Sequence, residues 1–184
     1  LAIKLVDKNC SKGDGNSCTL EALYLSKLRN KTKSNYKLIS LVNKVSYLYN
    51  KACILKQPFA CGMLYRYDMS LVDTDYYKSL FQSPLVYSMI RQKLINECLN
   101  NGDNEQDCEM KVDNEIANIN TYIAKMQYYE KHKDKYRKLF CKYAKSYNPG
   151  NVYFVSDIQK KVYDDYIEYL KNTVKDFKMK YCND

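Results

Sequence analysis

Residues 51–67, KACILKQPFACGMLYRY, decide the fold of this chain. Two cysteines, Cys53 and Cys61, stand eight positions apart within this stretch. Between them, a polar turn with Pro58 separates one apolar run from the next. Proline cannot donate a helical N–H and restricts the residue before it, so a helix should end ahead of this turn and restart after it. We predict a helix corner with a disulfide across it.

The same layout occurs twice more along the chain. Cys10 and Cys18 enclose a turn with the sequence KGDGN and precede the apolar run TLEALYLSKL. Cys98 and Cys108 enclose LNNGDNEQD and stand ten positions apart. The first cysteines of the three corners are therefore 43 and then 45 residues apart. Periods of this length are typical of helix-pair repeats, in which each pair buries its apolar face against its neighbours.

Composition favours an all-α fold. The chain has 184 residues, enough for one domain with a real core, and contains only 5 glycines and 3 prolines. Its apolar residues recur at helical spacing, and there are no long alternating runs of the kind that predict strands. We predict a single domain over residues 1–184. Disulfide-stapled helix pairs occupy residues 1–108, as a short solenoid, and a long antiparallel helical hairpin occupies residues 109–184.

Helix boundaries follow from caps and breakers. Ser17 and Ser83 are candidate N-caps, with Pro84 at a first helical position, and Asn101-Gly102 is a candidate helix end. We expect one long helix from about residue 105, continuing through the basic stretch 131–145. Its apolar residues step by four and three, as in a heptad seam: Val112, Ile116, Ile119, Ile123 and Met126. The expected helices cover residues 1–10, 17–29, 35–55, 59–69, 83–98, 105–145 and 156–181, with a break at 148–151.

The corners carry a family resemblance. Residues 9–25, NCSKGDGNSCTLEALYL, and residues 51–67 resemble the Cys-rich Sel-one-like repeats of the Helicobacter cysteine-rich protein family, which is related to tetratricopeptide repeats. Cys53 and Cys61 match both cysteine positions of such a repeat, and Leu64 and Tyr65 match its helix core. The likeness covers roughly residues 7–70. The Gly-x-Gly-Val turn of the family is missing, RNKTKSN stands in its place, and residues 112–184 do not look like the repeat.

The cysteines predict a disulfide framework. Their number, 8, is even, and no CxxC pair is present, which favours an oxidising compartment: periplasm, cell surface or extracellular space. The resemblance and the spacing of the cysteines indicate the same local pairs, and Cys141 would then be left to pair with Cys182. The local pairs are Cys10 with Cys18, Cys53 with Cys61 and Cys98 with Cys108. Long-range pairing of Cys53 or Cys61 would instead indicate an irregular helical bundle.

The sequence offers little chemistry. Zinc sites need clustered Cys and His, and His132 is the only histidine, so we expect no metal and no cofactor. His132 itself is expected to be a solvated surface residue. Asp164, Asp165 and Glu168 are expected on a solvated helix face rather than in acid–base catalysis. There is no serine-hydrolase, P-loop or metalloprotease motif. We predict that the chain is not an enzyme. The resembled family has been linked to penicillin binding and β-lactamase activity. A β-lactam-binding or hydrolysing enzyme is therefore a further interpretation, ranked third after the two binding proteins described below.

Charge and tyrosine content point to a partner. The formal charge is +9, and 20 residues are tyrosine, a residue that packs helices and is also enriched at protein-binding surfaces. The charge can reflect an acidic partner or only a lysine-rich surface. The candidate binding surface comprises Tyr65, Tyr67, Tyr76, Tyr77, Lys131, Lys135, Arg137 and Lys138.

These features predict a secreted, periplasmic or cell-surface protein–protein interaction module without catalytic activity. Its partner would be another protein or a peptide, with an acidic one among the options, and neither nucleic acid nor a membrane span is expected. Because the chain starts at Leu1 without Met, we also expect that a signal peptide has been removed. The alternative is a parasite or pathogen surface receptor ligand built as an irregular disulfide-bonded helical bundle.

Overall fold

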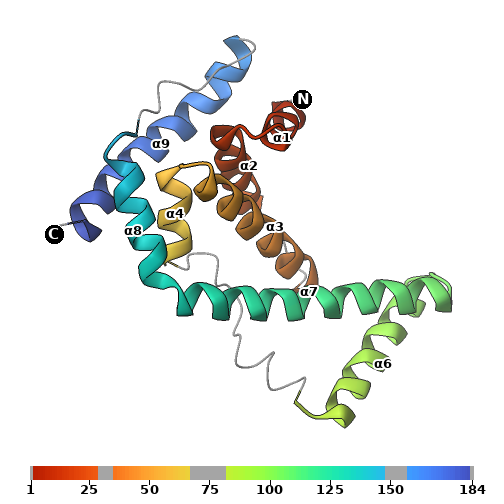
Figure 1. The fold of residues 1–184 in the computed structure, drawn as a ribbon. Helices are drawn as coiled ribbons and strands as arrows, with labels where there is room; N and C mark the ends of the chain where they lie inside the picture. Colours follow the sequence, from red (N-terminus) through yellow and green to blue (C-terminus); the bar gives the residue numbers. More distant parts are fainter. Residues whose placement is uncertain (1, 29–34, 67–81, 148–156, 183–184) are drawn as a thin grey trace.

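The computed structural model describes residues 2–28, 35–66, 82–147 and 157–182, and this part of the chain is helical without any strand (Figure 1). The all-α prediction is therefore confirmed. The aromatic residues Tyr67, Tyr76 and Tyr77 and the predicted break at 148–151 lie outside the described residues. The helices are α1 (Ala2–Ser11), α2 (Gly15–Leu28), α3 (Asn35–Ile54), α4 (Pro58–Arg66), α6 (Pro84–Asn100), α7 (Glu105–Lys131), α8 (Lys133–Ala144) and α9 (Asp157–Tyr181).

The helices form a body and an arm. Helices α1 to α4 pack in succession, and α4 also packs against α8 and α9. The long helix α7 crosses α3 and runs on beyond the body, where α6 packs on it (Figure 1). One hydrophobic cluster joins α1–α4 with α7, α8 and α9, so residues from both predicted parts of the chain share a core. A second, smaller cluster lies between α6 and the first half of α7.

The first cysteine corner ends α1 in a Schellman motif. The Gly13 amide donates to the Cys10 carbonyl at 3.0 Å, and the Asp14 amide donates to the Asn9 carbonyl at 3.1 Å. This pair of bonds satisfies the last carbonyls of a helix and requires a left-handed residue between them. Gly13 supplies it, with φ of 94°, a conformation that glycine adopts without steric cost.

The second corner has the same hydrogen bonds with a different residue at the left-handed position. Lys56 and Gln57 donate to the carbonyls of Cys53 and Ala52, both at 3.0 Å. Lys56 therefore takes the place of the glycine, with φ of 66°, which costs a residue with a Cβ about 1 kcal/mol or more. The two corners also pack on each other, since a Cβ on Gly15 would lie 2.9 Å from the Cβ of Leu55.

All eight cysteines form the four pairs that the sequence analysis predicts, and three of these pairs are local staples of helix corners. The local pairing of Cys53 with Cys61 disfavours the irregular-bundle alternative. The fourth disulfide closes the longest loop, across a separation of 41 residues, and ties the end of α9 to α8. The bonds are Cys10–Cys18, Cys53–Cys61, Cys98–Cys108 and Cys141–Cys182.

The predicted helix over residues 105–145 is wrong, because the chain bends at His132. This residue has φ of −105° and ψ of 21° and separates α7 from α8. The bend turns α8 onto α4 and buries Tyr136 and Phe140, so core packing outweighs the continuous helical pattern. The C-terminal hairpin is consequently formed by α8 and α9 alone. The predicted seam is confirmed, since four of its five residues are buried and Ile123 is half-buried.

Two of the three predicted caps are confirmed. The Ser83 hydroxyl accepts from the Val86 amide at the start of α6, and the end of that helix is capped by Asn101, followed by Gly102 with φ of 94°. Ser17 is not an N-cap. Helix α2 starts at Gly15, and the Cys18 amide donates to the Asp14 carbonyl at 3.1 Å, so Asp14 precedes the helix. Ser17 lies within the first turn and donates its hydroxyl to the Asp14 carboxylate.

Candidate functional site: a polar groove between α3 and α7

A polar seam runs along the crossing of α3 and α7. On α3 it consists of Asn43, Ser46 and Asn50, which are three and four residues apart and therefore share one side of the helix. Asn43 is 8 % exposed and Ser46 is fully buried. The Asn43 side-chain amide donates to the Asn118 carbonyl of α7 at 2.7 Å. Buried polar groups normally require such partners, so the seam fixes how the two helices meet.

Lys125 of α7 reaches across this seam. Its ammonium donates to the Asn43 carbonyl at 3.2 Å, and the Ser46 hydroxyl donates to the same oxygen at 3.0 Å. Partial burial lowers the pKa of the Lys125 ammonium. No carboxylate in the described part of the chain forms an ion pair with it. Lys125 is thus a half-buried cation held by a neutral carbonyl.

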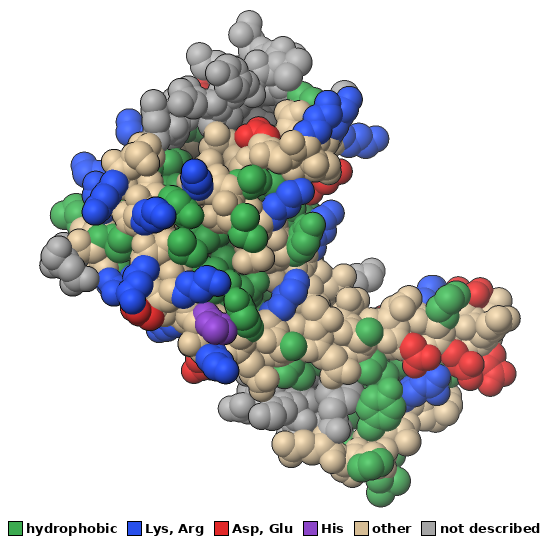
Figure 2. Space-filling model, in the orientation of Figure 1, with side chains coloured by type: hydrophobic (Ala, Val, Ile, Leu, Met, Phe, Trp, Pro, Cys, Tyr) green, Lys and Arg blue, Asp and Glu red, His purple; other side chains and the backbone are tan. Residues whose placement is uncertain are grey.

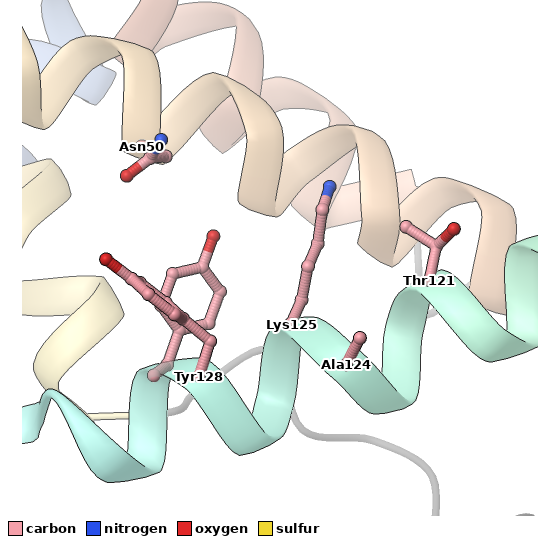
Figure 3. A pocket seen from close by; sticks show the side chains of 6 residues that line it. Asn50, Thr121, Ala124, Lys125 and Tyr128 are labelled. Atoms are coloured by element: carbon pink, nitrogen blue, oxygen red, sulfur yellow. The ribbon is translucent and has the colours of Figure 1, made fainter.

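Above the seam, the two helices leave an open groove of about 460 Å³. Figure 3 shows Asn50 from α3 facing the gap, with Lys125 and Tyr128 entering it from α7. The Asn50 amide oxygen accepts from the Tyr136 hydroxyl of α8 at 3.4 Å, so α8 contributes to one end of the groove. The groove is lined by Asn50, Thr121, Ala124, Lys125, Tyr128 and Tyr129.

One residue that lines the groove, Tyr128, is an exposed aromatic side chain. Tyr128 is 44 % exposed, and its ring lies 4.3 Å from the ring of His132. On α3, Tyr47 and Ile54 are 57 % and 70 % exposed and lie three and four residues from Asn50, on the same side of the helix. His132, predicted to be a solvated surface residue, lies at the surface (Figure 2), and its ring is partly covered by Tyr128.

Two residues of the predicted binding surface instead hold the fold together. The Tyr65 ring packs edge-on against the Tyr181 ring at 4.9 Å. Arg137 donates to the Tyr181 carbonyl at 3.3 Å and to the Asp134 carboxylate at 3.2 Å. The structure therefore brings Tyr65 and Arg137 together, but around the end of α9 rather than around a free surface.

The three predicted lysines are exposed. Lys138 pairs with Asp134 at 3.1 Å, and the Lys135 ammonium lies 5.9 Å from the Tyr136 ring centre. Lys131 is exposed at the end of α7, next to His132. Figure 2 shows several Lys and Arg side chains around the single histidine, with acidic side chains among them. Asp164, Asp165 and Glu168 are exposed on α9, as predicted.

The groove itself was not predicted. Its signal in the sequence is the spacing of Asn43, Ser46 and Asn50, polar residues at intervals of three and four along one side of α3. That pattern indicates a polar contact between helices. Lys125 interrupts the apolar seam of α7 in the same way, one residue before Met126. Neither pattern identifies its partner helix, so the site becomes visible only once α3 and α7 are placed together.

A second buried polar group lies among α1, α2 and α3. Glu21 is 2 % exposed, its Oε1 lies 3.9 Å from the Lys44 ammonium, and its Oε2 is a buried oxygen without a hydrogen-bond partner among the described residues. Burial first, and then the neighbouring Asp7 carboxyl, raise the pKa of Glu21 from 4.5 to about 7, against the opposing effect of Lys44 and Lys51.

The fold and its staples define an all-α, disulfide-linked helical protein. Four disulfides indicate an oxidising environment. Within the described ranges, none of the helices combines the length and the apolar character that crossing a membrane requires. Comparison with known protein families, with curated proteins and with solved structures finds no match to the chain.

Proposed function

We propose that the chain is a secreted, periplasmic or cell-surface protein–protein interaction module without catalytic activity, which binds its partner in the α3–α7 groove. The observation that carries this proposal is a groove lined by the polar Asn50, Thr121 and Lys125 and by the exposed ring of Tyr128. Protein-binding sites characteristically surround a few anchoring aromatic residues with polar groups. Tyr128 provides such an anchor in the groove.

The floor of the groove is preorganised, which favours binding. Asn43, Ser46 and Lys125 are held by hydrogen bonds to one another or to α7 backbone, so little side-chain freedom remains to be lost. Disulfides at the start of α2 and at the end of α3 hold the supporting helices in place. A rigid site loses less entropy on association and therefore binds more tightly for the same contacts.

The hydroxyl groups near the groove support a binding role over a catalytic one. The Thr121 hydroxyl donates to the Ala117 carbonyl at 3.0 Å, and the Ser46 hydroxyl is buried and donates to a carbonyl as well. A hydroxyl nucleophile needs a general base as its hydrogen-bond acceptor. A backbone carbonyl cannot take the proton.

A peptide library displayed on phage tests the proposal. Ala124 is exposed in the groove, so Ala124→Trp should fill the site without disturbing the core. Ala117→Trp is the matched control, because Ala117 is exposed on the same helix but does not line the groove. Peptides selected on the wild-type protein should bind Ala124→Trp at least about tenfold more weakly and Ala117→Trp unchanged. If every selected peptide binds both variants equally, the groove is not the binding site.

A further inference from the structure

Lys125 indicates which partner the groove accepts. We infer that the groove binds an acidic side chain of a protein segment, with its carboxylate on the Lys125 ammonium and a neighbouring aromatic or aliphatic side chain against Tyr128. The inference rests on the proposed function and names the chemistry of its partner. It follows from the hydrogen bonding of Lys125, from the charges around it and from the shape of the groove.

The ammonium has unused capacity for a ligand. A lysine ammonium carries three N–H donors, and the described residues provide Lys125 with one acceptor, the Asn43 carbonyl at 3.2 Å. The side chain is half-buried and lies in the wall of an open groove. A partly desolvated cation without a counter-charge is unfavourable in the free protein, and an incoming carboxylate removes that penalty.

The surroundings favour a carboxylate over a second cation or a polyanion. Lys125 is the single charged residue among those that line the groove, whose other polar members are the neutral Asn50, Thr121, Tyr128 and Tyr129. One ammonium balances one carboxylate, whereas polyanion sites align several cations along the ligand backbone.

The rest of the surface supports the approach of such a partner. The chain carries a formal charge of +9, and Lys131, next to His132 on the same helix as Lys125, is exposed. Such a field increases the rate at which an acidic segment arrives, while the desolvated pair at Lys125 sets how long it stays. The exposed ring of Tyr128 lies beside Lys125 in the groove and offers an apolar contact to the residue next to the carboxylate (Figure 3).

The test uses the groove-dependent peptides, meaning those that bind wild type and Ala117→Trp but not Ala124→Trp. They should be enriched in Asp or Glu beside an aromatic or aliphatic residue. Each is then resynthesised with Gln for Glu or Asn for Asp, and affinities are measured at one ionic strength by calorimetry. The amide peptide should bind wild type about 30-fold more weakly than the acidic peptide, as expected for loss of a buried charge pair.

Variants of the protein separate this contact from general charge attraction. Lys125→Gln should bind acidic and amide peptides equally. Lys125→Met, which keeps the apolar stem, should give the same result and replaces Lys125→Gln if that variant folds poorly. Lys131→Gln removes an exposed lysine of the same helix and should weaken the acidic peptide by about fivefold or less. Groove-dependent peptides that ignore the amide exchange would overturn this inference alone, whereas a complete lack of groove-dependent peptides would overturn the proposed function as well.

Discussion

Replacing Glu21 with Gln should stabilise the protein above neutral pH and leave its stability in mild acid nearly unchanged. In the folded chain the Glu21 carboxyl is 2 % exposed, and its Oε2 lacks a hydrogen-bond partner among the described residues. The Asp7 carboxyl of α1 adds negative charge, and the nearest cation, Lys44, is 3.9 Å away. Ionising Glu21 in this position is therefore unfavourable, and Gln avoids that cost while keeping the size of the side chain.

The size of the effect follows from the pKa. Burial and Asp7 raise the pKa of Glu21 from 4.5 to about 7, which corresponds to about 3 kcal/mol of differential stability. Between these two values the folded state holds a proton that the unfolded state has released. The free energy of unfolding therefore falls as the pH rises through this window, and the contribution of the protonated carboxyl is lost above it. Gln resembles the protonated form at every pH, so the variant does not undergo this loss.

Urea unfolding followed by circular dichroism, with the disulfides intact, measures the difference. The free energy of unfolding of Glu21→Gln minus that of wild type should rise from near zero at a pH of about 4 to about 3 kcal/mol at a pH of about 8. Glu168→Gln, at an exposed position of α9, is the control and should show a small difference that does not change with pH. A difference for Glu21→Gln that stays flat with pH, or a less stable variant at the higher pH, would falsify the reasoning and indicate that Glu21 is ionised and paired with Lys44.

Further substitutions test the helix corners, the disulfides and the groove. Lys56→Gly should raise the free energy of unfolding by about 1 kcal/mol, and Gly13→Ala should lower it by a similar amount. Both residues have a left-handed backbone conformation, which glycine adopts without steric cost and a residue with a Cβ does not. Urea midpoints that move in the same direction for the two variants would contradict this reasoning. Replacing both Cys141 and Cys182 with Ser should lower the free energy of unfolding by about 4 kcal/mol, since this disulfide closes the longest loop. Removing the Cys10–Cys18 disulfide, which closes a short loop, should lower it by about 2.5 kcal/mol. If thermal unfolding shows that the Cys10–Cys18 variant loses as much stability or more, loop entropy does not determine the contribution of these disulfides. Lys125→Met should raise the free energy of unfolding near neutral pH, because burial disfavours the charged ammonium and lowers the pKa of Lys125. The gain over wild type should shrink as the pH approaches 10.5, because the neutral amine resembles Met. A gain that grows with pH would show that the folded state does not disfavour the Lys125 ammonium.

The corners could be predicted from sequence because their determinants are local. Two cysteines eight positions apart, with a turn between them, specify both the helix ends and the disulfide, and the structure shows the same hydrogen bonds at Gly13 and at Lys56. The left-handed conformation of Lys56 was not predictable, because nothing in its own residue type favours it. It follows from the position of Lys56 in the corner, where Gly13 stands in the other copy.

The bend at His132 was missed for the opposite reason. Helical periodicity continues across it, so the local sequence favours one long helix. What outweighs that preference is tertiary: α4 offers a surface on which Tyr136 and Phe140 become buried. A single-sequence pattern contains no information on that surface, which lies more than sixty residues earlier in the chain.

The missed bend and the missed groove have a common origin. Because α8 turns back at His132, the Tyr136 hydroxyl comes within hydrogen-bond distance of Asn50, and one end of the groove acquires a defined border. If α7 continued straight through residue 145, residues 133–144 would not pack on α4. Asn50 would then lack its hydrogen bond from the Tyr136 hydroxyl. The border that Asn50 and Tyr136 form at this end of the groove therefore depends on the helix boundary at His132, which the sequence did not reveal.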